Sequence, residues 1–311
     1  MLKYYVRNTN DEAFRQLPGY SDQSGLWVYG EQPQANELDV LSEQFDLDRN
    51  ILRDVMDKDE LPRLEVSDGG LYVFFRSVLR NKHGEIESAP VLVVLTPRVF
   101  VSLSLTNAIS DQKIAAAAHM APTEDQGNLL LATFTALVTD YESSIQRTGR
   151  YIKDIGHRLK THEVNNSDFI HFVTVEDNLG IYSLNLTSML TVAERLRDNK
   201  SNHLSREHIE STDDIILHLR QLLVSVQTLT QTVTSIRNAY STIANNNLNI
   251  RMKRLTVLTV LIALPNVFYG MYGMNVVLPF QDSPGAYAFI VGFTAVLILL
   301  VYVLAKRFRL F

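Results

Sequence analysis

The residues whose types and spacing could do chemistry form a stripe in a charge-free stretch near the end of this 311-residue chain. They recur at steps of three and four residues, which places them on one face of a helix. We call this set the polar stripe: Thr256, Thr259, Ala263, Asn266, Gly270 and Gly273. Such a stripe is typical either of a small-residue packing seam between helices or of a pore lining. Asn266 favours the pore, because an amide in hydrocarbon needs a partner or water.

Other kinds of chemistry find little support in the sequence. With no cysteine, the chain has no disulfide, thiolate zinc site, iron–sulfur cluster or cysteine nucleophile. Its eight histidines show no recognisable ligand spacing, and no glycine-rich phosphate loop, HExxH or GxSxG pattern occurs. Four acids within residues 54–60 could form a metal cluster, although a solvated helix end is the alternative. We therefore expect a protein that is not an enzyme and has no organic cofactor.

Two apolar segments must position the polar stripe. Leu255–Met274 gives twenty predominantly apolar positions without a charge, and Ala286–Ala305 gives twenty more. Twenty helical residues rise about 30 Å, which is the thickness of the hydrocarbon core of a bilayer. We predict a transmembrane hairpin with spans at about 252–275 and 285–305, rather than two buried helices of a soluble core.

The charges that flank these spans predict their orientation. The net charge of −5 divides into +5 for residues 251–311 and −10 for residues 1–250. The basic residues that stand just before the first span and just after the second are Arg251, Lys253, Arg254, Lys306, Arg307 and Arg309. The connecting loop 275–285 has neither Lys nor Arg. By the positive-inside rule, both termini lie in the cytoplasm and the loop lies outside the cell membrane.

The residue pattern before the two spans predicts a head of mixed strands and helices, followed by a helical stalk. The expected fold class is an α+β cytoplasmic head, a long helical stalk and a C-terminal two-helix transmembrane hairpin, in domains 1–110, 111–250 and 251–311. Strands are predicted at runs rich in β-branched and aromatic residues, which are Leu26–Tyr29, Leu71–Phe75, Val91–Leu95 and Val99–Leu103. Helices are predicted at Ala35–Phe45 and Asp48–Lys58.

The stalk pattern is helical from about residue 123 to residue 200. A break is predicted at 164–168, where Ser167 or Asp168 is a natural N-cap.

The last helix of the stalk carries a heptad stripe that continues toward the membrane. Its apolar members are Ile215, Leu219, Leu222, Val226, Leu229, Val233, Ile236, Tyr240 and Ile243. Part of this stripe is expected to pack against the preceding helices. Residues 221–250 contain one charge, Arg237, among many Ser, Thr, Gln and Asn residues. Because a solvated face normally carries Lys and Glu, this composition indicates helices crowded around an axis.

The motif Tyr272-Gly273-Met274-Asn275 ends the first span. A Gly-Met-Asn tripeptide alone is a weak signal, but this one ends ten residues after Pro265 and precedes a short loop, a second span and a basic C-terminus. In this context the chain resembles the CorA family of divalent-cation channels, whose signature is this Tyr-Gly-Met-Asn. The stretches of the head that are similar to the family are Leu26–Val28, Leu52–Val55, Leu61–Glu65 and Leu71–Phe74.

The resemblance implies a homopentamer with a cytoplasmic α/β funnel, stalk helices that continue into the pore and a second helix outside them. It implies uptake of Mg²⁺, and also of Co²⁺ or Ni²⁺, driven by the membrane potential. Two charges that cross the membrane gain about 4.6 kcal/mol per 100 mV. The implied partners are further copies of the chain, membrane lipid and divalent cations, and not nucleic acid.

The resemblance also assigns a selectivity filter, made of Gly273, Met274 and Asn275. Mg²⁺ dehydrates reluctantly, so it tends to keep its waters. A ring of five Asn275 amides can accept hydrogen bonds from those waters without stripping them, whereas a ring of carboxylates would hold the ion too long.

At the cytoplasmic end of the first span, Met252 and Leu255 match the family's apolar constriction. Asn249, one turn earlier, matches a polar ring below it. Apolar rings can close a pore by dewetting. Together with the polar stripe, these three residues are expected to line the pore.

The chain departs from the family pattern after the motif. Many members continue with Met-Pro-Glu-Leu, whereas this chain has Val276–Asp282. Asp282 is the only extracellular carboxylate, so the capture of cations should be weaker or should depend on Asp282.

A regulatory cation site is implied between the head and a neighbouring stalk. The head position is Asp54, and the stalk position is Asp214, beside Asp213. A cation that bridges these carboxylates would clamp the closed state. Arg53 replaces a family glutamate and could neutralise Asp54, so two ordinary surface acids are the alternative.

Two other functions stay open at this point. A Zn²⁺ transporter on the same scaffold would usually carry Gly-Ile-Asn, with isoleucine at the position of Met274. A membrane-anchored sensor or scaffold would oligomerise through the stalk without ion flux, and it would not require the polar stripe or Asn275.

Overall fold

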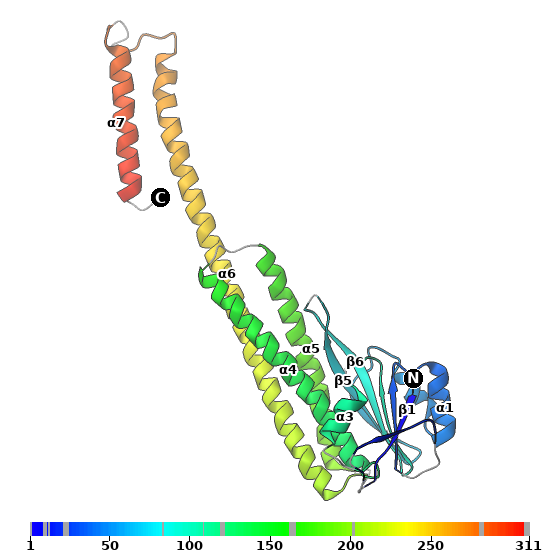
Figure 1. Cartoon of the computed structure of the whole chain (residues 1–311). Helices are drawn as coiled ribbons and strands as arrows, with labels where there is room; N and C mark the ends of the chain where they lie inside the picture. Colours follow the sequence, from blue (N-terminus) through cyan, green and yellow to red (C-terminus); the bar gives the residue numbers. More distant parts are fainter. Residues whose placement is uncertain are drawn as a thin grey trace. The chain divides into compact units, whose positions relative to one another are not determined.

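The computed structural model describes residues 2–8, 11, 13–20, 25–82, 84–107, 109–118, 122–161, 166–200, 203–279 and 283–307. The chain forms two compact units, Met1–Ser235 and Ile236–Phe311. The first unit contains a β-sheet and a helical bundle, and the second contains two long apolar helical segments (Figure 1).

The sheet of the first unit has the strand order β2-β1-β3-β7-β6-β5-β4. Its strands are β1 Leu2–Val6, β2 Arg15–Leu17, β3 Leu26–Glu31, β4 Arg63–Ser67, β5 Gly70–Arg80, β6 Ile86–Leu95 and β7 Val99–Ser104. β3 and β7 are parallel, and the other neighbouring pairs are antiparallel. The four predicted strands are confirmed as β3, β5, β6 and β7. The three others, which lie at or next to the sheet edges and are largely half-buried or exposed, were not predicted.

Two short helices follow β3. The first, α1, spans Ala35–Phe45, as predicted. The second, α2, spans Arg49–Asp54 and is shorter than predicted. The Asp48 side chain caps α2, because its Oδ1 accepts hydrogen bonds from the backbone N of Asn50 (2.9 Å) and of Ile51 (3.2 Å).

Both faces of the sheet are buried, which explains why its central strands read as continuous apolar runs. On one face, Leu38 of α1 and Leu52 of α2 belong to the same core as Phe74. On the other face, the ring of Phe75 packs on that of Phe134, with 4.4 Å between the centroids.

Four helices follow the sheet, namely α3 Asp111–Ala117, α4 Gln126–Thr161, α5 Asn166–Asp198 and α6 Arg206–Tyr272. Of the break predicted at 164–168, residues 164 and 165 lie outside the described residues, and residues 166–168 belong to α5. The predicted N-cap is wrong, because α5 already begins at Asn166, and Ser167 and Asp168 therefore lie within the helix.

The heptad stripe of α6 is buried or half-buried from Ile215 to Val233. In this part of the chain α6 lies beside α4 and α5 (Figure 1). Arg220 Nη2 is 2.8 Å from Glu194 Oε1 of α5, and His218 Nε2 is 3.3 Å from Glu142 Oε2 of α4. The stripe therefore packs inside the bundle of one chain, as expected for part of it.

The second unit consists of the C-terminal half of α6 and of α7, Ala286–Arg307. Both helices are long and apolar enough to cross a membrane. α7 packs on α6 through an edge-to-face contact of Phe268 with Phe293, whose ring centroids are 5.3 Å apart. The division into domains 1–110, 111–250 and 251–311 stays a prediction.

Candidate ion pathway

The polar stripe lies on the side of α6 that α7 leaves uncovered. Successive helical residues are turned by about 100°, which puts the stripe opposite the side that carries Val257, Leu264 and Phe268. Those three side chains are buried or half-buried, whereas every member of the stripe is exposed in the single chain. The stripe is therefore not a packing seam between the two helices of this unit. It faces either lipid or further copies of the chain.

The polar side chains of the stripe differ in how far their own helix satisfies them. Thr256 Oγ1 donates a hydrogen bond to the carbonyl O of Met252, and Thr259 Oγ1 donates one to that of Leu255, each at 2.9 Å. These hydroxyls need no further partner in an apolar environment. The Asn266 amide has no hydrogen-bond partner within the described ranges. Asn266 is thus the stripe residue that most requires water or a second chain.

The Gly-Met-Asn motif follows directly where α6 ends. Gly273 N donates to the carbonyl O of Tyr269 (3.0 Å) and of Gly270 (3.2 Å). A Cβ at Gly273 would lie 3.3 Å from the Tyr269 carbonyl O, which is a tight contact with backbone. The Asn275 side chain is exposed and contacts no hydrogen-bond partner in the part of the chain that the structure describes. Its amide is available to water or to a hydrated ion.

Two tyrosines position this end of α6, namely Tyr272, which begins the Tyr-Gly-Met-Asn motif, and Tyr269, which the sequence pattern does not single out. Tyr269 Oη is 3.1 Å from Thr294 Oγ1 of α7. Tyr272 Oη donates to the carbonyl O of Pro279 at 3.1 Å, which ties the loop to the helix. For Tyr269 the only sequence signal is an aromatic residue near the end of a span, and interfacial tyrosines without any such role give the same signal.

The predicted gate residues lie at the other end of the uncovered side. Asn249, Met252 and Leu255 are all exposed in the single chain, Met252 at 54% and Leu255 at 58%. Within one chain these side chains cannot form a closed constriction, so a constriction requires further copies.

Asp54 is paired with a different arginine from the one that the sequence suggests. Arg63 Nη2 is 2.6 Å from Asp54 Oδ2, and Arg63 also pairs with Glu60. Arg53 Nη2 instead lies 3.0 Å from Asp39 Oδ1. The expectation that Arg53 neutralises Asp54 is therefore wrong. Side chains of adjacent helical residues point in different directions, and Arg63, the first residue of β4, pairs with Asp54 instead.

Charge pairing shifts the pKa of groups around this site. Burial lowers the pKa of Arg63, but the hydrogen bond with Asp54 and the charge of Glu60 raise it by more, so the net shift is upward. The hydrogen bond from Arg49 is the largest cause of the lowered pKa of Asp39. Both groups stay charged near neutral pH.

The other predicted acids form no metal centre within one chain. Asp213 Oδ1 is 3.9 Å from Arg197 Nη1, and Asp214 is exposed. Over the described ranges, no three His, Asp or Glu side chains gather so that they could hold a metal ion, and this includes the acidic run at 54–60. Asp282 lies outside the described residues.

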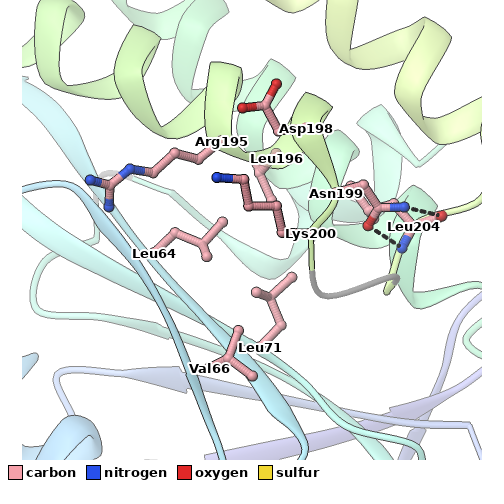
Figure 2. Close-up of a pocket in the computed structure, with 9 residues that line it drawn as sticks. All are labelled: Leu64, Val66, Leu71, Arg195, Leu196, Asp198, Asn199, Lys200 and Leu204. Carbon is pink, nitrogen blue, oxygen red and sulfur yellow. Dashed lines mark hydrogen bonds between the residues drawn. The ribbon is translucent and has the colours of Figure 1, made fainter.

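A cavity of about 290 Å³ lies between the β4–β5 hairpin and the end of α5 (Figure 2). The Asn199 side chain, which lines the cavity, is held by the backbone of Leu204. Its Nδ2 donates to the carbonyl O of Leu204 (2.7 Å), and its Oδ1 accepts from Leu204 N (3.1 Å). Arg195 and Lys200 line the cavity together with several leucines. None of the predicted site residues lines it, so it is separate from the candidate ion pathway.

Known proteins resemble the chain over nearly its whole length. A family model described as CorA-like Mg²⁺ transporter protein matches residues 22–307. The cobalt/magnesium transport protein CorA of Methanocaldococcus jannaschii is 19% identical over 300 residues, which cover 93% of this chain and 92% of that protein. The complete structure of the CorA magnesium transporter from the same organism has a TM-score of 0.83 at 17% identity, covering 99% of this chain and 98% of the other.

Two further structures share the fold. The full-length CmaX protein has a TM-score of 0.73 at 18% identity, covering 99% of this chain and 97% of the other. The ZntB cytoplasmic domain from Vibrio parahaemolyticus has a TM-score of 0.63 at 10% identity, covering 78% of this chain and 98% of the other. These similarities confirm the predicted fold class of mixed head, long helix and C-terminal transmembrane hairpin.

The family match spans most of the chain, and members of this family are membrane transporters of divalent cations rather than enzymes. The chain belongs to the CorA family of Mg²⁺ transporter proteins.

Proposed function

We propose that the chain forms a homopentameric channel of the cell membrane that admits hydrated Mg²⁺ under the membrane potential. The observation that carries this proposal is the position of the polar stripe, which α7 leaves uncovered and which leads to the exposed Asn275. Polar groups are costly against lipid, so copies arranged around an axis would turn the stripe into a water-lined path. The number five comes from the family resemblance, and the basic flanks favour cytoplasmic termini.

The filter of this channel consists of Gly273, Met274 and Asn275. Five Asn275 amides would accept hydrogen bonds from the waters of the ion and bind it weakly enough for release. Asp282 would attract cations to the outer mouth. Met252 and Leu255 would close the pore as apolar rings above a polar ring of Asn249.

A regulatory cation would bridge Asp54 of one copy and Asp214, with Asp213 beside it, of the next. Because Arg63 already holds Asp54 in the single chain, the cation has to compete with that ion pair. The bridge would convert repulsion between carboxylates into a clamp on the closed state.

Protease protection tests this regulatory site. The double variant Asp54→Asn with Asp214→Asn should lose the protection that Mg²⁺ gives to the stalk. The matched variant Arg63→Gln frees Asp54 and should keep that protection or reach it at lower Mg²⁺. Protection of the double variant at the wild-type Mg²⁺ concentration would show that Asp54 and Asp214 do not form the regulatory site.

A Zn²⁺ transporter on the same scaffold is the competing function, because Met274 is the one residue of the motif that argues against it. Fold alone does not select an ion, and Met274 is a single residue. Ion flux has to decide between the two.

The deciding experiment measures flux of Mg²⁺, Co²⁺, Ni²⁺ and Zn²⁺ into proteoliposomes that hold an inside-negative potential. We expect Mg²⁺ flux in the wild type, no flux in Asn275→Ala, and wild-type flux in Val296→Ala, which truncates an exposed apolar residue of α7. A preference for Zn²⁺ would favour the competing function. Absence of flux for all four ions would indicate a non-conducting sensor or scaffold.

A further inference from the structure

The head contains a second cavity that the ion pathway does not use. It has a volume of about 570 Å³ and lies among β1, β3 and α3. The lining residues that matter here are Lys3, Tyr5, Arg7, Phe14, Trp27 and Asp111. Its lining is mixed, with charged and aromatic side chains, and its size is typical of sites for small molecules.

Arg7 is the unusual residue of this cavity, because it is only 4% exposed. Its backbone is fixed by Thr123, whose N donates to the Arg7 carbonyl O (3.0 Å) and whose Oγ1 accepts from Arg7 N (3.1 Å). Its Nη2 donates to the carbonyl O of Asp11 at 2.9 Å. Its Nε and Nη1 are buried and have no hydrogen-bond partner among the described residues. A buried guanidinium that no described carboxylate pairs with is costly, so its position points to an anion.

Asp111, which lines the cavity, and Asp11, whose carbonyl O accepts from Arg7, are both already engaged. Asp111 Oδ2 is 2.7 Å from Lys3 Nζ and 2.5 Å from Tyr5 Oη. The Asp11 carboxylate accepts from the backbone N of Asn8 at 2.8 Å. Lys3 and Asp111 therefore balance one another, and no carboxylate among the described residues pairs with Arg7.

We propose that this cavity binds a small organic anion whose carboxylate or phosphate group pairs with Arg7. The guanidinium Cζ lies 5.7 Å from the centroid of the half-buried Phe14 ring. That ring turns aside to admit the anion to Nε and Nη1, where the planar fork accepts a carboxylate or phosphate with two hydrogen bonds. Phe14 contacts the apolar part of the ligand, and the buried Trp27 packs against Phe14 with 5.3 Å between the ring centroids. The proposal is independent of ion transport.

Trp27 is the only tryptophan of the chain, so its fluorescence reports on this cavity directly. The full-length protein in detergent is titrated with potassium phosphate and with potassium butyrate, and potassium chloride serves as the match for ionic strength. We expect a saturable change in Trp27 fluorescence with at least one of the two anions and none with chloride. A larger response to phosphate would identify a phosphate compound, and a larger response to butyrate would identify a carboxylate.

Three variants make the test specific. Arg7→Gln should abolish the saturable change, and Ala115→Phe, which fills the cavity without altering a charge, should abolish it as well. Lys82→Gln removes an exposed cation that does not line the cavity and should respond like the wild type. A thermal melt establishes that each variant is folded. The proposal is overturned if neither anion gives a saturable change in the wild type, if chloride gives the same change, or if the folded Ala115→Phe protein still responds.

Discussion

The sheet of the head and the polar stripe of α6 differ in how completely a single chain satisfies their side chains. In the head, Trp27 Nε1 donates to Ser102 Oγ and Tyr29 Oη donates to the carbonyl O of Ile109, each at 2.9 Å. In the second unit, the amides of Asn266 and Asn275 are exposed and have no partner within the described ranges. These two buried ring donors of the sheet are therefore satisfied within one chain, whereas the amides of the stripe and the filter require water or neighbouring copies.

The largest effect should come from crowding the end of the stripe. Gly273→Val places a branched side chain against the Tyr269 carbonyl O, where even a Cβ would be 3.3 Å away. We expect loss of Mg²⁺ flux in proteoliposomes with assembly unchanged. The matched variant Gly292→Val, on α7, meets no atom within 4 Å of the added Cβ and should keep its flux. Equal Mg²⁺ flux in both variants would show that the Gly-Met-Asn motif is not part of the ion pathway.

Replacing a leucine by alanine should lower the stability of the protein far more in the head than on the exposed side of α7. Leu92→Ala removes a fully buried side chain of β6 and should lower the free energy of unfolding of the head by about 2–5 kcal/mol. Leu299→Ala, at a position of α7 that is 63% exposed, should change stability by less than about 0.5 kcal/mol. Thermal unfolding of the full-length protein in detergent measures both. A large loss for Leu299→Ala would show that this side of α7 packs against protein.

The proposed gate predicts a smaller effect, seen as leak. Met252→Ala and Leu255→Ala each shorten an apolar side chain of the constriction and should let water remain in a closed pore. We expect more Mg²⁺ leak than in the wild type at high internal Mg²⁺. Leu258→Ala, on a different side of α6, serves as the control. Unchanged leak in both gate variants would locate the closure elsewhere.

The smallest effect concerns the cap of α2. Asp48→Ala should lower the stability of the head by about 1 kcal/mol, the typical value of an N-cap. The hydrogen bond from Ile51 N is the largest cause of the lowered pKa of Asp48. Because its folded pKa is below the usual 3.8, this stabilisation is complete above that value and is lost as pH falls through the folded pKa.

Chemical denaturation at several pH values measures how much the Asp48 cap contributes to the free energy of unfolding. Asp48→Asn keeps a capping oxygen but cannot titrate, so it should retain most of the stability at neutral pH and lose its part of the acid dependence. An acid dependence equal to that of the wild type would assign the effect to other carboxylates.

Sequence patterns predicted those elements whose local signal agrees with their burial. α1 has its predicted bounds because its apolar residues repeat with helical spacing, and β5 to β7 are apolar because both sheet faces are covered. β2 has three residues, none of them buried, and leaves no such pattern. The predicted cap of α5 failed because a residue that favours an N-cap can equally lie within the first turn.

The side-chain partners of the candidate sites were harder to predict, because they depend on contacts between distant parts of the chain. The sequence places Arg53 beside Asp54, but the fold pairs Asp54 with Arg63. Arg7 is held by Thr123, which is 116 residues away, so no local pattern indicates its cavity. The polar stripe could be predicted because its members lie on one helix and only helical spacing is needed to align them.

The most direct test of the central claim is whether the polar stripe faces water. Since the chain has no cysteine, single cysteines can be introduced at Thr259 and Asn266 of the stripe, and at Leu258 and Met271, which are also exposed, as apolar controls. The rate of modification by a charged, membrane-impermeant methanethiosulfonate is then measured in proteoliposomes, because only a thiol in water ionises and reacts readily. We predict fast modification of Thr259→Cys and Asn266→Cys and slow modification of the two controls. Slow modification at all four positions, or no difference between stripe and controls, would contradict this prediction.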